Sequence, residues 1–277
     1  MNWRFIPYSE HDGAANMAID VALLEKALEG PPVLRLYGFV PSCLSIGLNQ
    51  KLDDETFARV KQKGFDVVRR PSGGRAVLHH KDLTYSFIAA EKNSCEYGIL
   101  EHSVSGAYKQ ICQGLQEAFA LLGLKTELGS SQAAYRHLAD CFLATTNADL
   151  HFNGKKLVGS AQLRRHGCVL QHGSIPLALE QEIMPELLGD KKAARLTGET
   201  PGPGAVAPAA HERHANLYEL LNRHVAVAEL NDAMRLGFEK AFSIEFELES
   251  LSERELELAA VNKLSACWQP RHNEELV

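Results

Sequence analysis

The dipeptide Asn153-Gly154 lies in the middle of the stretch ADLHFNGKKLVGSA, which runs from residue 148 to residue 161. Asparagine and glycine favour the two-residue type I′ turn, because both of its central positions need a positive φ. The stretch therefore predicts a β-hairpin, and the two strands of a hairpin are antiparallel. A chain that contains this hairpin is not expected to form a purely parallel sheet.

The remaining segments of the chain predict further strands and several helices. Runs rich in β-branched and apolar residues predict strands at 33–39, 43–48, 65–70, 75–80, 84–90 and 167–177. Apolar residues at helical spacing, with Asp12 as a cap for the first helix, predict helices at 14–29, 53–63, 103–123, 180–189, 214–223, 227–243 and 252–267. We expect an α/β (α+β) fold with a mixed, mainly antiparallel sheet flanked by helices. The C-terminal helices either pack on this sheet or form a small subdomain.

The composition argues against several classes of protein. A net charge of −6 does not favour nucleic acid as the main partner of the 277-residue chain. No apolar run approaches the roughly 18 residues of a membrane span, and the N-terminus lacks the features of a signal peptide. We therefore expect a cytoplasmic protein that acts neither on nucleic acid nor at a membrane.

The cysteines and histidines do not predict a metal site. The six cysteines form no CxxC pair, and the twelve histidines show no metal-ligand spacing, so neither zinc nor a disulfide framework is expected. Composition alone treats each cysteine as a small buried apolar residue. Cys141 is one of the six, and it precedes Lys156 by fifteen residues.

A glycine-rich loop is the first candidate for chemistry. The segment RRPSGGRAVLHH, residues 69–80, places Gly73 and Gly74 between two predicted strands. Backbone N–H groups of such a loop can bind a carbonyl or phosphate oxygen. The alternative is a glycine-rich hairpin with solvated arginines. The loop is neither a P-loop nor a dinucleotide-binding fingerprint, because both spacings are absent.

A lysine and a histidine on predicted strands are the other candidates. Side chains alternate along a strand, so Lys155 and Lys156 should point to opposite faces, with Val158 on the face of Lys156. The small residues of 159–161 leave room for a ligand beside that lysine. The alternative is that both lysines are solvated. His172 can be either a catalytic base or a hydrogen-bonded structural residue.

Four sequence blocks together resemble the superfamily of lipoate ligases and octanoyltransferases. The blocks are DGAANMAID, VLRLYGFVPSCLSIGLNQ, RRPSGGRAVLHHKDLTYSF and NGKKLVGSAQLRRHGCVLQHGSI, and the resemblance covers roughly residues 5–180. It implies a mixed-sheet catalytic domain of the biotin- and lipoate-ligase type, here residues 1–250, with 251–277 as a helical extension packed on it. It also implies that the Gly-Gly loop and the lysine line a narrow tunnel for a medium-length acyl chain. The implied substrate-binding residues are Arg70, Ser72, Gly73, Gly74, Ala76, His79, Gly159, Ser160, Ala161, His172 and Gly173.

Within this superfamily the chain resembles the cysteine-dependent octanoyltransferases of the LipM type. Lipoate ligases need no cysteine at the position of Cys141 and usually carry a further domain. The resemblance implies that Cys141 and Lys156 are catalytic, and that Cys141 carries the acyl group as a thioester. The implied donor is octanoyl-acyl carrier protein, and the implied acceptor is a lipoyl-domain protein, the glycine cleavage H protein or an E2 subunit. No cofactor is implied.

Several alternatives stay open at this point. The chain could be an ATP-dependent lipoate ligase, an octanoyl amidotransferase between lipoyl domains, or a non-catalytic relative. Either Lys156 or His172 could accept the proton that leaves the acceptor amine. The arginines of both blocks could form a dock for acidic partners or could be scattered on the surface: Arg69, Arg70, Arg75, Arg164 and Arg165.

Overall fold

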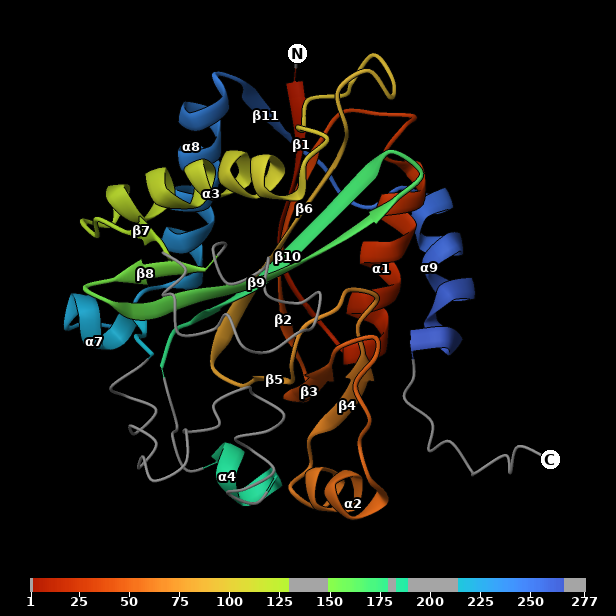
Figure 1. The fold of residues 1–277 in the computed structure, drawn as a ribbon, viewed down its shortest axis with the longest axis vertical. Helices are drawn as coiled ribbons and strands as arrows, with labels where there is room; N and C mark the ends of the chain where they lie inside the picture. The colour runs from red at the N-terminus through yellow and green to blue at the C-terminus, as the bar shows by residue number, and fades with distance from the viewer. Residues whose placement is uncertain (1, 130–148, 179–182, 189–213, 267–277) are drawn as a thin grey trace.

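An eight-stranded sheet forms the centre of the computed structural model, which describes residues 2–129, 149–178, 183–188 and 214–266 (Figure 1). In spatial order the strands are β11 Glu245–Leu248, β1 Asn2–His11, β2 Val33–Phe39, β6 Asp82–Ala90, β10 Cys168–Pro176, β9 Lys155–Arg165, β8 Leu150–Phe152 and β7 Glu127–Leu128. β1 runs parallel to both of its neighbours, and the other neighbouring pairs are antiparallel. The expected mixed, mainly antiparallel sheet is confirmed.

The predicted hairpin joins β8 to β9. Asn153 and Gly154 have φ values of 49° and 79°, which are the positive angles that the type I′ turn needs. The sequence did not predict three strands, β1, β7 and β11. In β1, Pro7 lacks an N–H group, and the pairing with β2 is irregular between Ile6 and Ser9. This irregularity hides the alternation by which a strand is normally recognised.

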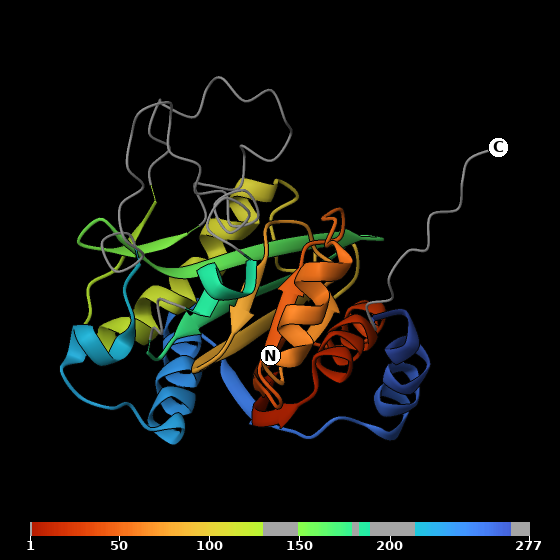
Figure 2. The same cartoon turned by 90° about the horizontal axis from the view of Figure 1, so that it is seen from below.

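Two pairs of helices cover the two faces of the sheet (Figures 1 and 2). α3 Val104–Leu121 and α8 Val227–Phe242 lie on one face, where their apolar side chains form one core with those of β2, β6 and β1. α1 Gly13–Lys26 and α9 Glu253–Ala266 lie on the other face and share a second core. Asp12 caps α1, as expected, by accepting a hydrogen bond from the Ala15 N–H at 2.7 Å. α8 and α9 are therefore parts of the two layers.

A second, three-stranded sheet extends the α1 side of the molecule. It contains β4 Asp66–Arg69, β3 Cys43–Ile46 and β5 Val77–His79, in that spatial order. α2 Asp54–Gln62 and α4 Ile183–Leu188 flank it, and the short α7 Leu217–Leu221 lies near β8 (Figure 1). A separate apolar core, which includes Leu44, Ile46, Val60 and Leu187, joins this sheet to its helices.

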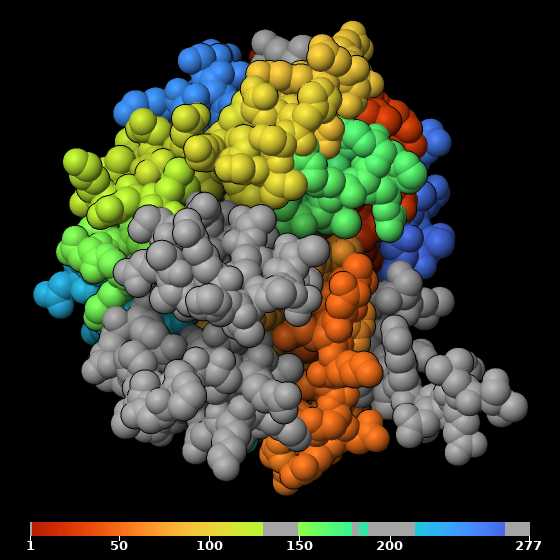
Figure 3. Space-filling view, in the orientation of Figure 1, coloured from red at the N-terminus to blue at the C-terminus, as the bar shows by residue number. Residues whose placement is uncertain are grey.

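The space-filling view shows the same face as Figure 1. The turn between β9 and β10 reaches the surface there, next to α3 (Figure 3). No helix within the described ranges has both the length and the apolar character that crossing a bilayer requires.

The crossing of α3 and α8 predicts a stability effect at Gly237. A Cβ atom at Gly237 would lie 2.3 Å from the backbone nitrogen of Ala118, so Gly237→Ala forces the two helices apart. We expect a loss of about 1–3 kcal/mol in the free energy of unfolding, as for other overpacked cores. Gly30→Ala is the matched control, because a Cβ there meets no atom within 4 Å. Urea unfolding of both variants measures the effect, and equal stability of the two would contradict the predicted clash.

Candidate functional site

Polar side chains line the α1 face of the central sheet in two rows. Residues directly opposite each other on antiparallel strands point to the same face. The register of β9, β10, β6 and β2 gives one row of Ala161, His172, Ser86 and Arg35, and a second row of Gly159, Ser174, Thr84 and Tyr37. The opposite face carries the apolar side chains that pack on α3 and α8. One part of the α1 face is therefore polar, whereas the part that includes Val33, Ile88 and Leu170 belongs to the apolar core shared with α1 and α9.

Asp20 of α1 is the centre of this polar layer. Its buried carboxylate accepts hydrogen bonds from Arg35 at 2.8 Å, Tyr37 at 2.9 Å and Ser86 at 2.9 Å, and contacts Nδ1 of His172 at 3.2 Å. Burial raises the pKa of Asp20, but the hydrogen bond from His172 and the charge of Arg35 outweigh it and hold that pKa below its usual value. Asp20 therefore stays ionised inside the protein.

His172 connects Asp20 to the glycine-rich loop. Its Nε2 lies 2.5 Å from Oγ of Ser72, and both side chains are buried, with exposed fractions of 5% and 1%. Burial lowers the pKa of His172, although the Asp20 carboxylate opposes this shift. The neutral imidazole is thus the favoured form. Asp20, His172 and Ser72 form a continuous chain of contacts from α1 through β10 to the loop.

Arg70 holds the glycine-rich loop from within. Its guanidinium donates to the backbone oxygens of Gly73 at 2.9 Å, Arg75 at 2.5 Å and Ser45 at 3.1 Å. Burial lowers the pKa of Arg70 to about 10. Gly74 has a φ of 92°, a conformation that side chains other than glycine rarely adopt. The loop is therefore fixed by its own arginine, and Arg70 acts on the loop backbone.

The structure places the five arginines of the two blocks, which could form a dock or be scattered, in different environments. Arg70 is buried, Arg69 donates to the backbone oxygens of residues 47, 48 and 50, and Arg164 forms an ion pair with Glu91 at 2.7 Å. Arg75 and Arg165 are exposed. Arg69, Arg70 and Arg164 therefore bind groups of the protein itself, which a sequence pattern does not show.

Lys156 reaches the same face through a β-bulge. The register between β8 and β9 shifts, because Leu150 pairs with Val158 while His151 pairs with Lys156, so Leu157 is an extra residue. A Cβ atom at Gly159 would lie 3.1 Å from Nζ of Lys156. The bulge thus turns Lys156 toward the face of Gly159. The prediction from simple alternation, which put Lys156 on the face of Val158, is wrong, because Val158 is a fully buried residue of the core on the opposite face.

Two contacts fix Lys156 in this position. Its Nζ forms an ion pair with Asp149 at 2.8 Å, and the side chain is about one-third exposed. Its backbone oxygen accepts a hydrogen bond from the Ala215 N–H at 2.8 Å. Lys156 thus lies on a strand, as predicted, and its side chain lies over Gly159.

His79 forms a second chain of contacts next to the first. Its Nδ1 contacts Asp82 at 2.8 Å, its Nε2 contacts Oγ of Ser45 at 2.9 Å, and its ring stacks on Phe39. Ser45 Oγ also accepts a hydrogen bond from Arg70 at 3.2 Å. His79 therefore supports the loop through Arg70.

The other predicted site residues have different neighbourhoods. Ser160 points to the opposite face, where its Oγ lies 2.7 Å from the Tyr85 hydroxyl, and a Cβ at Gly173 would collide with that Oγ. Ala76 is buried in the core of the small sheet. A Cβ at Gly74 would lie 3.9 Å from Cβ of Ala161, so the loop covers β9 there. Cys141 lies outside the described residues.

The structure adds residues that sequence reasoning missed. Asp20 and Asp149 hold His172 and Lys156, while Ser45 and Asp82 support His79. One signal was present in the sequence, because polar residues occupy alternate positions of three strands that are otherwise apolar. Such alternation predicts a polar face.

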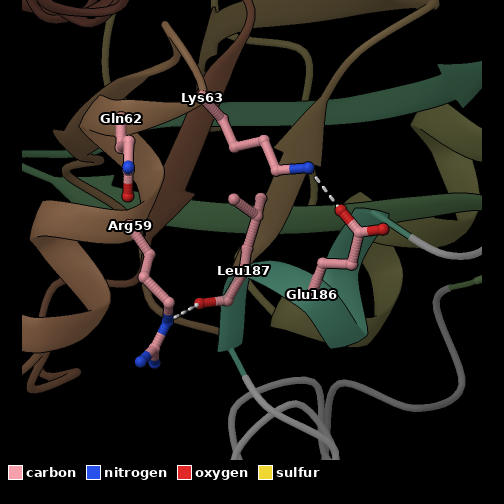
Figure 4. Close-up of a pocket in the computed structure, with 5 residues that line it drawn as sticks. All are labelled: Arg59, Gln62, Lys63, Glu186 and Leu187. Carbon is pink, nitrogen blue, oxygen red and sulfur yellow. Dashed lines mark hydrogen bonds and ion pairs between the residues drawn. The ribbon is translucent and has the colours of Figure 1, made fainter.

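One pocket lies apart from these residues. It has a volume of about 400 Å³ and is lined by Arg59 and Gln62 of α2, by Lys63 at the end of that helix, and by Glu186 and Leu187 of α4 (Figure 4). Lys63 pairs with Glu186, and Arg59 donates to the Leu187 oxygen. These contacts join α4 to α2, and the pocket shares no residue with the polar layer.

Comparison with known proteins identifies similar sequences. The model of the lipoyl protein ligase A/B catalytic domain matches residues 12–239. A curated relative from Anoxybacillus flavithermus, named octanoyltransferase LipM, is 38% identical over 267 residues and aligns over 92% of this chain and 91% of its own. A relative of the same name from Staphylococcus aureus is 34% identical over 274 residues, with 95% and 94% covered.

Solved structures show the same fold at lower identity. A crystal structure of lipoate-protein ligase A bound with ATP has a TM-score of 0.73 and 21% identity, and the match covers 95% of this chain and 94% of that chain. The bipartite lipoate protein ligase from Thermoplasma acidophilum, studied with its E2 lipoyl domain, has a TM-score of 0.72 and 20% identity, with 95% and 92% covered.

The buried histidine predicts a pH dependence of stability. His172 has a folded-state pKa below its ordinary 6.5, so the unfolded chain binds a proton there at a pH where the folded protein does not. The free energy of unfolding should therefore fall as the pH drops below about 6.5. His172→Gln should reduce this loss, and urea unfolding at about pH 7.5 and 5.5 measures it. The lowered pKa of Asp20 acts near and below 3.8, outside this range. An unchanged pH dependence in the variant would contradict the assignment.

Proposed function

The chain belongs to the lipoyl protein ligase A/B catalytic-domain family, and we propose that it transfers an octanoyl group from octanoyl-acyl carrier protein to a lysine amine of a lipoyl domain. Relatives that align over nine-tenths of the chain are named octanoyltransferases, whereas the ATP-bound ligase shares the fold at 21% identity. A thioester donor is already activated, so this reaction needs no ATP. The proposed place of action is the cytoplasm, and the proposed catalytic domain is residues 1–250 with 251–277 packed on it.

The position of the Lys156 ammonium group carries this proposal. It is held by Asp149, lies over Gly159, and shares a face of β9 with Ala161 and the glycine-rich loop. A fixed cation at this place can stabilise the oxyanion that forms when a thioester carbonyl is attacked. The acyl group is proposed to lie along the small residues Gly159 and Ala161 of β9, beside this cation. This arrangement suits acyl transfer by a nucleophile that arrives beside Lys156.

The proposed nucleophile is Cys141. In the sequence it precedes Asp149, the partner of Lys156, by eight residues. Its thiolate attacks the carbonyl carbon of the octanoyl thioester, the C–S bond to the carrier protein breaks, and the carrier protein leaves as its thiolate, which takes a proton from solvent. We propose that Cys141 lies beside Lys156, whose charge would favour the thiolate form of the cysteine. The product of this step is an octanoyl-enzyme thioester.

A lysine amine of the acceptor then attacks the octanoyl-enzyme. A C–N bond forms, the C–S bond to Cys141 breaks, and the product is an amide. The proposed acceptors are lipoyl-domain proteins, either the glycine cleavage H protein or an E2 subunit. An eight-carbon chain buries about seven methylene and methyl groups, each worth roughly 0.8 kcal/mol, so chain length should affect binding strongly.

The acyl-enzyme can be detected directly. After incubation with octanoyl-acyl carrier protein and no ATP, we expect an intact mass increase of one octanoyl group that hydroxylamine removes. Cys141→Ala should abolish the adduct, because it removes the accepting sulfur. Cys95→Ala, which removes a partly exposed free cysteine, should retain it. An adduct that survives Cys141→Ala, or one that requires ATP, would contradict the proposal.

Lys156 should be needed for formation of the adduct. Lys156→Ala removes a charged oxyanion donor, and loss of one such donor typically lowers the rate by about 10²–10³-fold. Lys155→Ala is the matched control, because it removes the neighbouring lysine without changing the group that lies over Gly159. Rapid-quench mass spectrometry of the adduct measures both rates. Similar rates for the two variants would exclude the proposed role of Lys156.

A further inference from the structure

The second half of the proposed reaction needs a proton acceptor. The acceptor amine becomes positively charged when its nitrogen bonds to the acyl carbon, so a proton must leave it. We propose that the chain Asp20–His172–Ser72 receives this proton, with Ser72 as the group that faces the acceptor amine. This inference rests on the proposed acyl transfer and adds to it the residues that act in the second half.

Hydrogen-bond chemistry fixes the direction of the chain. An ionised carboxylate only accepts, so Nδ1 of His172 must carry the hydrogen that points to Asp20. In a neutral imidazole Nε2 is then an acceptor, and the Ser72 hydroxyl donates its hydrogen to Nε2. The remaining lone pairs of Ser72 Oγ can accept from a second donor. The same order of groups activates the hydroxyl in serine hydrolases.

The chain lies beside Lys156 on the same face of the sheet. His172 is directly opposite Ala161, and Lys156 Nζ lies over Gly159, two residues along β9. Two residues of a strand span roughly 7 Å. An acyl carbonyl placed between them would therefore have the Lys156 cation on one side and the Ser72 hydroxyl on the other.

The alternative acceptors are already engaged. Lys156 donates to Asp149 at 2.8 Å, which is the arrangement of a cation that stabilises negative charge. His79 contacts Ser45, whose Oγ accepts a hydrogen bond from Arg70 inside the fold. Among the described residues, Ser72 Oγ has His172 as its hydrogen-bond partner. The geometry therefore favours His172 over Lys156, a choice that the sequence left open.

Each bond and proton of the step is accounted for. The acceptor nitrogen bonds to the acyl carbon, and the C–S bond breaks to release the Cys141 thiolate. The proton on nitrogen passes to Ser72 Oγ as the Ser72 proton passes to Nε2 of His172. Asp20 then pairs with the imidazolium that has formed, and the proton is later returned to solvent. Asp20 acts only through His172, so it is a positioning residue.

The charges around His172 set the pH range of the step. Asp20 favours the protonated imidazole, whereas burial and the charges of Arg70 and His79 oppose it. His172 is thus neutral above about pH 6.5 and ready to accept a proton. Below the pKa of His172, the acceptor amine and His172 must each lose a proton before transfer. Each of the two deprotonations lowers the transfer rate tenfold for every unit by which the pH falls, so the rate should fall about a hundredfold per unit, compared with tenfold above that pKa.

The two half-reactions can be measured separately. Enzyme is first acylated with octanoyl-acyl carrier protein, and a lipoyl domain is then added while intact mass follows loss of the adduct. We expect His172→Gln and Ser72→Ala to slow this transfer by about 10²–10⁴-fold, the usual effect of a general base. Both variants should form the adduct within about threefold of the wild-type rate. In His172→Gln the transfer rate should fall only about tenfold per pH unit at low pH, because the deprotonation of His172 no longer contributes.

His80→Gln is the matched control. His80 is a histidine of the same segment whose Nδ1 contacts a hydroxyl, that of Ser42, at 2.8 Å. It should retain both rates. If His172→Gln proves unfolded by circular dichroism, Ser72→Ala carries the test, because it removes a single hydroxyl.

Two results would overturn the inference. One is transfer within threefold of the wild-type rate in Ser72→Ala, and the other is an equal slowing of both half-reactions. Failure of the proposed function would look different, because the wild-type enzyme would then form no octanoyl adduct at all.

Discussion

The buried carboxylate of Asp20 is the interaction on which the arrangement of the site depends. Removing a charge from water costs several kcal/mol, and good geometry with several donors is needed to offset that cost. Arg35, Tyr37, Ser86 and His172 supply these donors from three neighbouring strands. Asp20 thus joins α1 to β2, β6 and β10 in one fixed register. The loop position follows, because Ser72 contacts the histidine that Asp20 orients.

The same face of the sheet receives Lys156 by a different route. A regular strand would direct Lys156 away from Gly159, and one extra residue, Leu157, reverses that direction. Asp149 and the backbone contact with Ala215 then fix the lysine. The site thus combines a region held by a buried charge with a region held by a local irregularity.

The sequence predicted the regular parts of this structure well. The turn at Asn153-Gly154 and the helix cap at Asp12 follow from local backbone preferences, and both are confirmed. β1 and β11 were missed, because each gains its stability from pairing between distant parts of the chain. The resemblance pointed to His172 and Ser72 but not to Asp20. The role of Asp20 depends on its contact with His172, which lies 152 residues further along the chain. The bulge at Leu157 can be recognised only from the pairing of β8 with β9.

The parallel pairing of β1 with β11 has a consequence for synthesis of the chain. Asn2 pairs with Glu245 and Phe5 pairs with Leu248, so the outer side of β1 has no strand partner until the chain up to Leu248 has left the ribosome. An unpaired strand edge is a template for association with other nascent chains. In the folded protein this edge of the sheet is the short strand β11, which carries the exposed Glu245 and Glu247. Charged side chains on a four-residue strand discourage further strand addition, so the last strand protects the first.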